Sequence, residues 1–281
     1  MKKLKVALSN FASLLGQDFI NLLHLFDGYG KDDQVNTYAK ELRETGIIRI
    51  DNFLPRELCD QIAQQIETIT SQHNGSTELS SGAYLNFRNE NKSGGSDKGM
   101  VDIFNIDYAI DDIGDIDFSL VEDILEVTTK QKIVHYRKNA YVNRGVKGTR
   151  GYHVDNVQPV LFKAFVYLTD VPDLSYGPYS FVKRSHRFSR SVYYNIFRNL
   201  FVSSANNTDM PVYDENQVYS AIGKKGSLII SNQNAIHRGM PQEEGKTRIV
   251  LILNYMVLSK LSYLHKSAKE NLKNKPRLAP V

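Results

Sequence analysis

The sequence predicts a mainly β domain of the sandwich or jelly-roll class, with helices added on its N-terminal side. From residue 133 onward, short segments alternate apolar and polar residues at period two and are separated by turn residues, which is typical of strands. Before residue 133, apolar residues recur at three- and four-residue steps, which is typical of amphipathic helices. The 281 residues suffice to bury a full core, and β sandwiches of this size often form one domain.

The composition excludes several classes of protein. Hydrophobic residues make up 41% of the chain and charged residues 23%, which excludes disordered and fibrous proteins. The net charge of +4 suggests an anionic substrate or surface but is too small for a nucleic-acid-binding protein, so we expect no nucleic-acid partner. The single cysteine, Cys59, indicates a reducing compartment, and no apolar run is long enough to span a bilayer. We therefore expect the protein in the cytoplasm, or at the inner face of a membrane.

Residues 1–36 are expected to form an extension that consists mainly of an amphipathic helix. The apolar positions that predict this helix are Leu4, Ala7, Leu8, Phe11, Leu14, Leu15, Phe19, Leu22, Leu23 and Phe26. The helix either packs on the main domain or lies in a membrane interface. A helix in the interface normally carries more Lys or Arg on its polar face, so packing on the domain is favoured.

The next segments are expected to alternate between helix, strand and loop. Helices are predicted over 37–45 and 56–69, with a strand over 46–50 between them and Pro55 in the turn that precedes the second helix. Ser, Gly, Asn and Lys dominate residues 71–98, which we interpret as a mobile loop that forms a lid or an access loop.

The strand predicted over 133–143 has one strongly polar face, formed by His135, Arg137, Asn139, Tyr141 and Asn143. That face is either the solvent side of a half-buried sheet or the lining of a pocket for a polar ligand. Further strands are predicted over 161–169, 179–184, 227–231 and 248–256, with a polar insertion over 195–219.

Residues 259–281 form a basic tail in which Lys and Arg outnumber the lone Glu270. The tail is either solvated or attracted to an anionic membrane or glycan surface.

Two histidines and one aspartate carry the main chemical signal. His153 and Asp155 lie two residues apart on one extended segment, so their side chains point to the same side and can reach one metal ion. His237 follows the apolar strand at 226–230, in a loop that can return it to the same ion. A His-x-Asp pair with a distal His is the ligand set of a facial triad, which holds Fe(II) by one face and leaves the opposite positions open.

Arg248 is the fourth candidate. It follows His237 by eleven residues (248 − 237 = 11) and opens an otherwise apolar strand. A buried arginine is costly without an anion, so we expect a carboxylate partner. That carboxylate belongs either to the protein, in a salt bridge, or to an organic-acid cosubstrate held by the guanidinium fork.

Four stretches together resemble the phytanoyl-CoA dioxygenase family of Fe(II)- and 2-oxoglutarate-dependent oxygenases. They are residues 41–54 with Cys59-Asp60, then His153-Val154-Asp155, then residues 177–186, and finally His237 with Arg248. The resemblance covers residues 38–256 and implies a double-stranded β-helix, which is a cupin-like jelly roll. It implies an oxygenase domain at 37–258 with the N-terminal helices packed on it.

The resemblance also implies the cofactors. Fe(II) would be held by His153, Asp155 and His237. The cosubstrate 2-oxoglutarate would chelate the iron and place its distal carboxylate on Arg248, and O2 would be the second cosubstrate.

Tyr141 and Phe165 are, by position, candidates for lining the cosubstrate pocket. The sequence departs from the family at Phe165, where relatives often carry Trp. It departs again before His186, where Val182-Lys183-Arg184-Ser185 replaces the usual Pro-Gly-Ser. We interpret His186 as a structural turn residue, because the metal already has its ligands.

The function predicted from the resemblance is hydroxylation of an unactivated C–H bond, with release of succinate and CO2. Asp155 disfavours halogenation, because halogenases of this class lack that carboxylate. Two other classes stay open: a non-catalytic jelly-roll protein that binds a metal or ligand, and a Zn(II) hydrolase, which leaves Arg248 unexplained.

The expected substrate is a small or a lipid- or glycan-linked molecule, and an anionic one is favoured. Arg88, Lys92, Lys98 and Arg150 could meet such a substrate, although a solvated loop would contain the same residues. Residues 1–30 and 259–281 could together make peripheral contact with an anionic membrane. The sequence predicts no oligomeric state.

Overall fold

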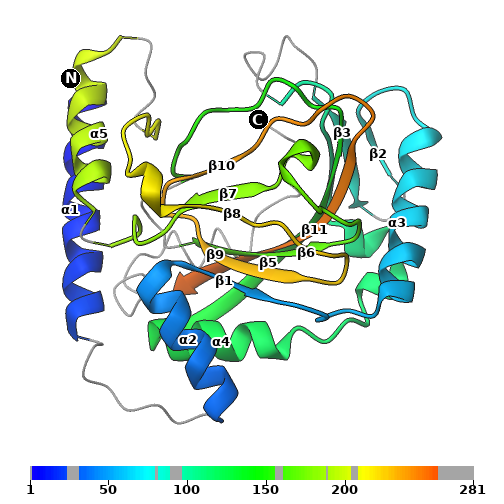
Figure 1. Ribbon diagram of the computed structural model, residues 1–281, viewed down its shortest axis with the longest axis horizontal. Coiled ribbons are helices and arrows are strands. Elements are labelled where there is room, and N and C mark those ends of the chain that lie inside the picture. The colour runs from blue at the N-terminus through cyan, green and yellow to red at the C-terminus, as the bar shows by residue number, and fades with distance from the viewer. Residues whose placement is uncertain are drawn as a thin grey trace.

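The computed structural model describes residues 2–23, 32–79, 82–88, 97–155, 161–187, 189–203 and 208–258. The strands form two antiparallel sheets (Figure 1). The larger sheet has the order β1-β9-β6-β11-β5-β4-β3-β2, and the smaller one has the order β10-β7-β8. The strands are β1 (Ile47–Ile50), β2 (Thr77–Glu78), β3 (Tyr84–Phe87), β4 (Val101–Phe104), β5 (Lys132–Arg144), β6 (Leu161–Tyr167), β7 (Tyr179–Val182), β8 (Val218–Ser220), β9 (Leu228–Asn232), β10 (His237–Gly239) and β11 (Thr247–Leu258).

Helices surround the sheets at one face and one flank. They are α1 (Lys2–Leu23), α2 (Asp33–Thr45), α3 (Arg56–Ser71), α4 (Ser119–Thr129) and α5 (Arg190–Phe201), with short 3-10 turns η3 (Ile106–Tyr108), η4 (Asp111–Ile113), η5 (Leu174–Tyr176) and η6 (Glu215–Gln217). The predicted fold class is confirmed: the protein is mostly β, with a large antiparallel sheet and added helices.

One apolar core lies between the two sheets. Alternation along β6 and β11 turns Phe165, Val250 and Ile252 toward Tyr179 and Phe181 of β7. The sheets therefore pack face to face, as in a jelly roll.

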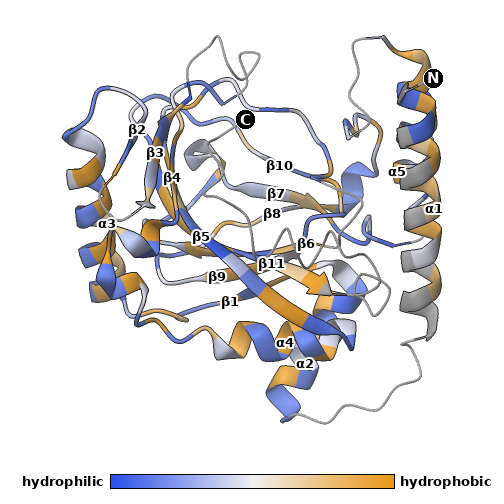
Figure 2. Ribbon diagram, turned by 180° about the vertical axis from the view of Figure 1, so that it is seen from behind, coloured by the Kyte–Doolittle hydropathy of each residue, from blue (hydrophilic) through white to orange (hydrophobic). Residues whose placement is uncertain are grey.

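A second core lies on the other face of the larger sheet, beneath α2, α3 and α4. Figure 2 shows apolar and polar residues alternating along these helices, so that each has an apolar side to bury. The start of α2 is capped by Asp32, whose side chain accepts a hydrogen bond from the Val35 amide, and Cys59 of α3 is buried in this core. The helices therefore support the sheet that carries most of the site.

Helices α1 and α5 lie side by side on one flank of the molecule (Figures 1 and 2). Ala7 and Leu14 of α1 pack with Val192 and Ile196 of α5 in a third apolar cluster, which also contains Val154. The helix pair is therefore anchored on the segment between His153 and Asp155.

Two expectations about loops need correction. The interpretation of residues 71–98 as one loop was wrong where the segment is described, because 77–78 and 84–87 pair as β2 and β3 at the edge of the larger sheet. The polar insertion expected over 195–219 includes most of α5, where buried Asn195 and Asn199 use their amides to bond loop carbonyls, and the first two residues of β8, which pairs with β7. The basic tail over 259–281 lies outside the described residues. Among the described helices, none is both long and apolar enough to cross a membrane.

His186 is a buried structural residue, as the sequence suggested. Its Nε2 donates to the Arg43 carbonyl at the end of α2, at 3.0 Å, and its ring packs on Gly46. Gly46 has φ +85°, and a Cβ atom there would lie 2.5 Å from His186 Nδ1. Burial lowers the pKa of His186 to about 4.

The buried imidazole predicts a loss of stability in mild acid. Its folded pKa lies below the unfolded value of 6.5, so the unfolded chain gains a proton first as the pH falls through 6.5 toward 4. As the pH falls from roughly 7 to 5, His186 should lower the free energy of unfolding by about 2 kcal/mol. His186→Gln, which keeps a donor for the Arg43 carbonyl, should lose that much less stability than the wild type in metal-free urea unfolding. Equal losses in both proteins would contradict this role.

Candidate metal centre

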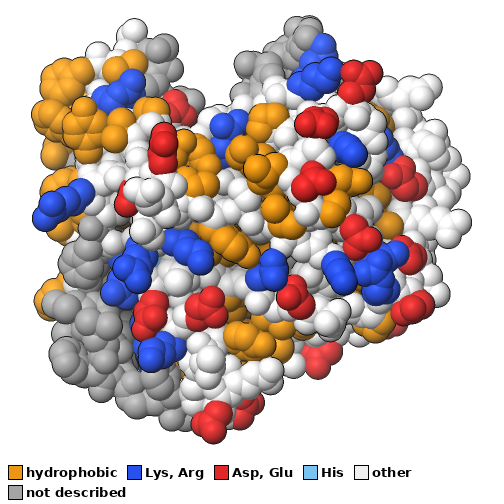
Figure 3. Space-filling view, viewed as in Figure 1, with side chains coloured by type: hydrophobic (Ala, Val, Ile, Leu, Met, Phe, Trp, Pro, Cys, Tyr) orange, Lys and Arg blue, Asp and Glu red, His pale blue; other side chains and the backbone are white. Residues whose placement is uncertain are grey.

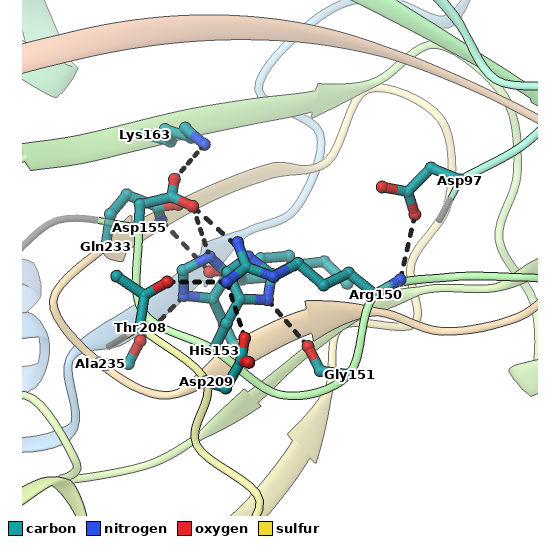
Figure 4. Close-up of polar contacts among 12 residues, drawn as sticks. Asp97, Arg150, Gly151, His153, Asp155, Lys163, Thr208, Asp209, Gln233 and Ala235 are labelled. Carbon is teal, nitrogen blue, oxygen red and sulfur yellow. Dashed lines mark hydrogen bonds and ion pairs between the residues drawn. The ribbon is translucent and has the colours of Figure 1, made fainter. Parts of the chain in front are cut away.

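The three predicted ligands come together at one end of the space between the sheets, where a loop after β5 meets the start of β10 (Figure 4). His153 and His237 exchange two backbone hydrogen bonds of 2.9 Å, and the Asp155 amide donates to the Gln233 carbonyl at 3.1 Å. The backbone therefore fixes the positions of all three ligands.

Both imidazoles are oriented by backbone carbonyls. Nδ1 of His153 donates to the Gly151 carbonyl at 2.9 Å, and Nδ1 of His237 donates to the Ala235 carbonyl at 2.8 Å. Because a carbonyl can only accept, Nδ1 carries the proton in each ring, and the neutral ring presents the lone pair of Nε2 to the site.

The ligand atoms converge on one point. Asp155 Oδ1 lies 3.4 Å from His153 Nε2 and 3.5 Å from His237 Nε2. Ligands about 2.1 Å from one ion and at right angles would lie about 3 Å apart, so the three atoms need only a small adjustment to bind it. Three electron-pair donors this close require a proton or a metal ion between them. Two nitrogens and one carboxylate oxygen suit a divalent transition metal held by one face.

Lys163 is a site residue that sequence reasoning missed. It lies on β6, and its Nζ lies 2.5 Å from Asp155 Oδ2, the oxygen that does not face the histidines. Alternation places Lys163 on the same face of β6 as Phe165. A lysine on an otherwise apolar strand face was the available signal.

The charge of Asp155 is secured by its neighbours. Burial alone would raise the pKa of this carboxyl, but the ammonium group of Lys163 opposes burial, and the pKa lies well below the usual range. Burial of Lys163 would lower the pKa of its ammonium group, but Asp155 raises that pKa above its ordinary value. The pair is therefore ionised near neutral pH.

The guanidinium of Arg248 is buried, and two of its nitrogen atoms have no hydrogen-bond partner among the described residues. It is on the same face of β11 as Val250 and Ile252, which belong to the core between the sheets. Its Nε and Nη1 atoms are buried and have no hydrogen-bond partner among the described residues. A Cβ atom at Gly239 would lie 3.9 Å from its Nη2, so the guanidinium faces β10, which begins at His237. Burial lowers the pKa of Arg248, and an anionic ligand would restore the lost interactions.

Tyr141 and Phe165, the two predicted pocket residues, both pack in the core between the sheets. Phe165 packs on Tyr179 with ring centroids 4.6 Å apart, and Tyr179 in turn lies 5.5 Å from the His237 ring. Tyr141 is half-buried against the core between the sheets, with the charges of Lys163 and Asp155 close enough to influence its pKa, which burial raises.

The polar face predicted for 133–143 is turned inward along part of β5. Asn139 and Asn143, which share the face of Tyr141, are buried. This part of the strand therefore fits the pocket-lining interpretation and not the solvent-facing one.

Two of the four basic residues offered for an anionic substrate, Arg88 and Arg150, are committed to protein carboxylates. Arg88 bonds Asp102 at 2.8 Å and Asp97 at 3.0 Å. Arg150 bonds Asp209 at 3.0 Å beside the metal centre (Figure 4). Lys92 lies outside the described residues.

Lys163 should compete with a metal ion for the carboxylate. Lys163→Met leaves Asp155 without its cation and should lower the metal-free free energy of unfolding by about 1–2 kcal/mol, a figure discounted for partial exposure. Co(II) or Ni(II) should then stabilise the variant more than the wild type, because the ion replaces the missing charge. Thermal unfolding with and without metal measures both effects. Asp155→Asn is the control that should gain little from either ion; an equal gain in wild type and Lys163→Met would argue against the competition.

No family model and no curated protein matches this chain. Solved structures do match it. The epimerase SnoN, in complex with Fe3+, alpha ketoglutarate and nogalamycin RO, is 13% identical with a TM-score of 0.57, over 80% of this chain and 84% of SnoN. EvdO2 from Micromonospora carbonacea var. aurantiaca, complexed with 2-oxoglutarate, is 12% identical with a TM-score of 0.57, over 83% and 94%.

The carbocyclase SnoK from nogalamycin biosynthesis, described as non-heme and alpha ketoglutarate dependent, is 14% identical with a TM-score of 0.54, over 81% of this chain and 85% of SnoK. At such low identity these likenesses show the fold. The narrower resemblance to the phytanoyl-CoA dioxygenase family stays a prediction. The chain has the jelly-roll fold of non-heme, 2-oxoglutarate-dependent enzymes.

Proposed function

We propose that the protein is an Fe(II)- and 2-oxoglutarate-dependent dioxygenase of the phytanoyl-CoA dioxygenase type, which hydroxylates an unactivated C–H bond. Two features of one interior carry the proposal. Three electron-pair donors converge there, and the buried guanidinium of Arg248 has no hydrogen-bond partner for Nε and Nη1 in the part of the chain that the structure describes. Fe(II) would bind the three donors, and the distal carboxylate of 2-oxoglutarate would pair with the guanidinium.

The donor set fits iron. His153, Asp155 and His237 would hold Fe(II) by one face and leave the remaining positions to 2-oxoglutarate and O2. When bound, the iron and these cosubstrates would supply the oxidising chemistry, with succinate and CO2 as by-products. The carboxylate of Asp155 would occupy the third ligand position, which disfavours halogenation.

The chain's own residues position and shield the reacting groups. Arg248 would hold the far carboxylate of 2-oxoglutarate with its Nε and Nη1 atoms, which are free among the described residues. Phe165 and Tyr179 supply an apolar wall that would exclude water, and Tyr141 packs against the same core. Lys163 keeps Asp155 anionic and bonds its second oxygen, which favours ligation through Oδ1 alone.

The class of substrate is inferred from charge. A small or a lipid- or glycan-linked anionic substrate is favoured by the net charge of +4. Arg88 and Arg150 already pair with carboxylates and add little to that argument.

Removal of the Arg248 charge should have opposite effects on stability and on 2-oxoglutarate binding. Arg248→Met should raise the free energy of unfolding by about 1–3 kcal/mol without ligand, because an unpaired buried guanidinium is replaced by an apolar side chain. The same change should weaken 2-oxoglutarate binding by at least about 30-fold, the equivalent of about 2 kcal/mol. Urea unfolding and calorimetric titration with Co(II) in place of iron measure the two effects without turnover.

Arg144→Met is the matched control, because Arg144 pairs with Glu67 at the surface. It should not alter 2-oxoglutarate binding. If Arg248→Met bound 2-oxoglutarate as tightly as the wild type, the assignment of Arg248 would fail.

Turnover of the cosubstrate tests catalysis itself. With Fe(II), O2 and 2-oxoglutarate, the wild type should release succinate slowly even without its substrate, and His153→Ala should release none while keeping its fold. Succinate assays with circular dichroism as the fold control provide the measurement. Tight binding of metal and 2-oxoglutarate with no succinate would favour the non-catalytic alternative, and hydrolysis with Zn(II) would favour the hydrolase.

A further inference from the structure

Helices α1 and α5 expose an apolar surface that the rest of the fold does not use. Its residues, here called the α1–α5 ridge, are Leu4, Leu8, Leu15 and Phe19 of α1 and Tyr194, Phe197 and Phe201 of α5. Leu8 is 61% exposed, Phe197 62% and Phe201 75%. Large apolar side chains gathered in this way mark interaction sites, whereas single exposed ones are ordinary.

The two helices present one continuous ridge. Positions 4, 8, 15 and 19 of α1 fall on one helical stripe, and so do positions 194, 197 and 201 of α5. Phe11 contacts Tyr193 between the stripes, with ring centroids 5.0 Å apart, and so joins them. Figure 3 shows hydrophobic side chains gathered over this corner of the molecule, with Lys or Arg among them.

The ridge is held firmly on the domain. Ala7 and Leu14 bury the inner side of α1, and Lys3 donates to the carbonyls of Val202 and Ser203 at 3.1 Å, at the end of α5. The exposed stripe is therefore what remains after α1 has packed. The wide apolar face of α1 that the sequence predicts is therefore divided between the buried contact with the domain and the exposed stripe.

The charge on these helices identifies the partner. The two segments carry five basic residues, Lys2, Lys3, Lys5, Arg190 and Arg198, and one acidic residue, Asp18. Their net charge is 5 − 1 = +4, which equals that of the whole chain, so the remainder is neutral overall. A symmetric pairing of two copies would bring these like charges together, whereas an anionic bilayer attracts them.

We propose that the α1–α5 ridge docks the protein on an anionic lipid bilayer, with the apolar stripes in the interface and the basic residues at the headgroups. The inner side of the helix pair, opposite the ridge, packs with Val154 and Ile236, which neighbour the metal ligands, so docking would hold the metal centre near the membrane. The docking itself does not depend on the proposed oxygenase activity.

Vesicle sedimentation tests the proposal with the full chain. The wild type should bind vesicles of an equal mixture of phosphatidylcholine and phosphatidylglycerol, bind phosphatidylcholine alone far more weakly, and dissociate as salt rises. Leu8→Glu/Phe197→Glu should reduce binding at least about tenfold, because two large apolar side chains no longer enter the interface. Lys5→Glu should weaken binding on the order of fivefold or more while leaving the apolar stripes intact.

Tyr108→Glu is the matched control, because Tyr108 is 59% exposed on η3, whose Ile106 packs in the core beneath α2, α3 and α4. It should bind vesicles like the wild type. Circular dichroism melting should show that all variants are folded, since the changed side chains are exposed.

Three results would overturn the proposal. The first is unchanged vesicle binding by the double variant, which would move the contact to another segment such as the basic tail at 259–281. The second is equal binding to neutral vesicles. The third is a lipid-free dimer that the double variant dissociates in sedimentation velocity, which would assign the ridge to a second copy of this chain.

Discussion

The convergence of three electron-pair donors on one point is the constraint on which the site depends. Two backbone carbonyls fix the protons of His153 and His237 on Nδ1, so both Nε2 atoms and Asp155 Oδ1 face one another without a hydrogen between them. Such an arrangement is repulsive until a cation enters. The fold maintains it through the two-bond backbone bridge between His153 and His237, which ties a loop of the larger sheet to an edge strand of the smaller one.

The two cations of the site differ in burial and in partner: Lys163 is half-buried, and Arg248 is buried. Lys163 is paired with the outer oxygen of Asp155, whereas Arg248 has no partner for Nε and Nη1 among the described residues. The first cation therefore belongs to the protein's own charge balance, and the second is left for a ligand. An apolar interior makes this difference large, since an unpaired charge there is far more costly than at the surface. The unpaired charge of Arg248 therefore lowers the stability of the ligand-free protein, and the same charge favours binding of an anionic ligand.

The sequence was most informative where a short-range pattern determines the structure. Period-two alternation predicted β5, β6 and β11, and the spacing of His153 and Asp155 predicted two ligands on one side. Lys163 was missed because its role depends on the register between β6 and a distant loop, which no local pattern encodes. Strands β2 and β3 were missed for a similar reason. In a segment rich in polar residues, they become strands only through pairing, of β3 with β4 and of β2 with β3. The sequence left open whether Arg248 pairs with a protein carboxylate or with a ligand. Its Nε and Nη1 are buried and have no partner among the residues described, which favours the ligand.

The most direct test of this account is a crystal structure with Co(II) and 2-oxoglutarate, with anomalous scattering used to locate the ion. The account predicts one ion bound by His153 Nε2, His237 Nε2 and one oxygen of Asp155, with the keto acid on its open side and the distal carboxylate on Arg248. An ion bound elsewhere, or His237 turned away from the other two ligands in a folded protein, would contradict it.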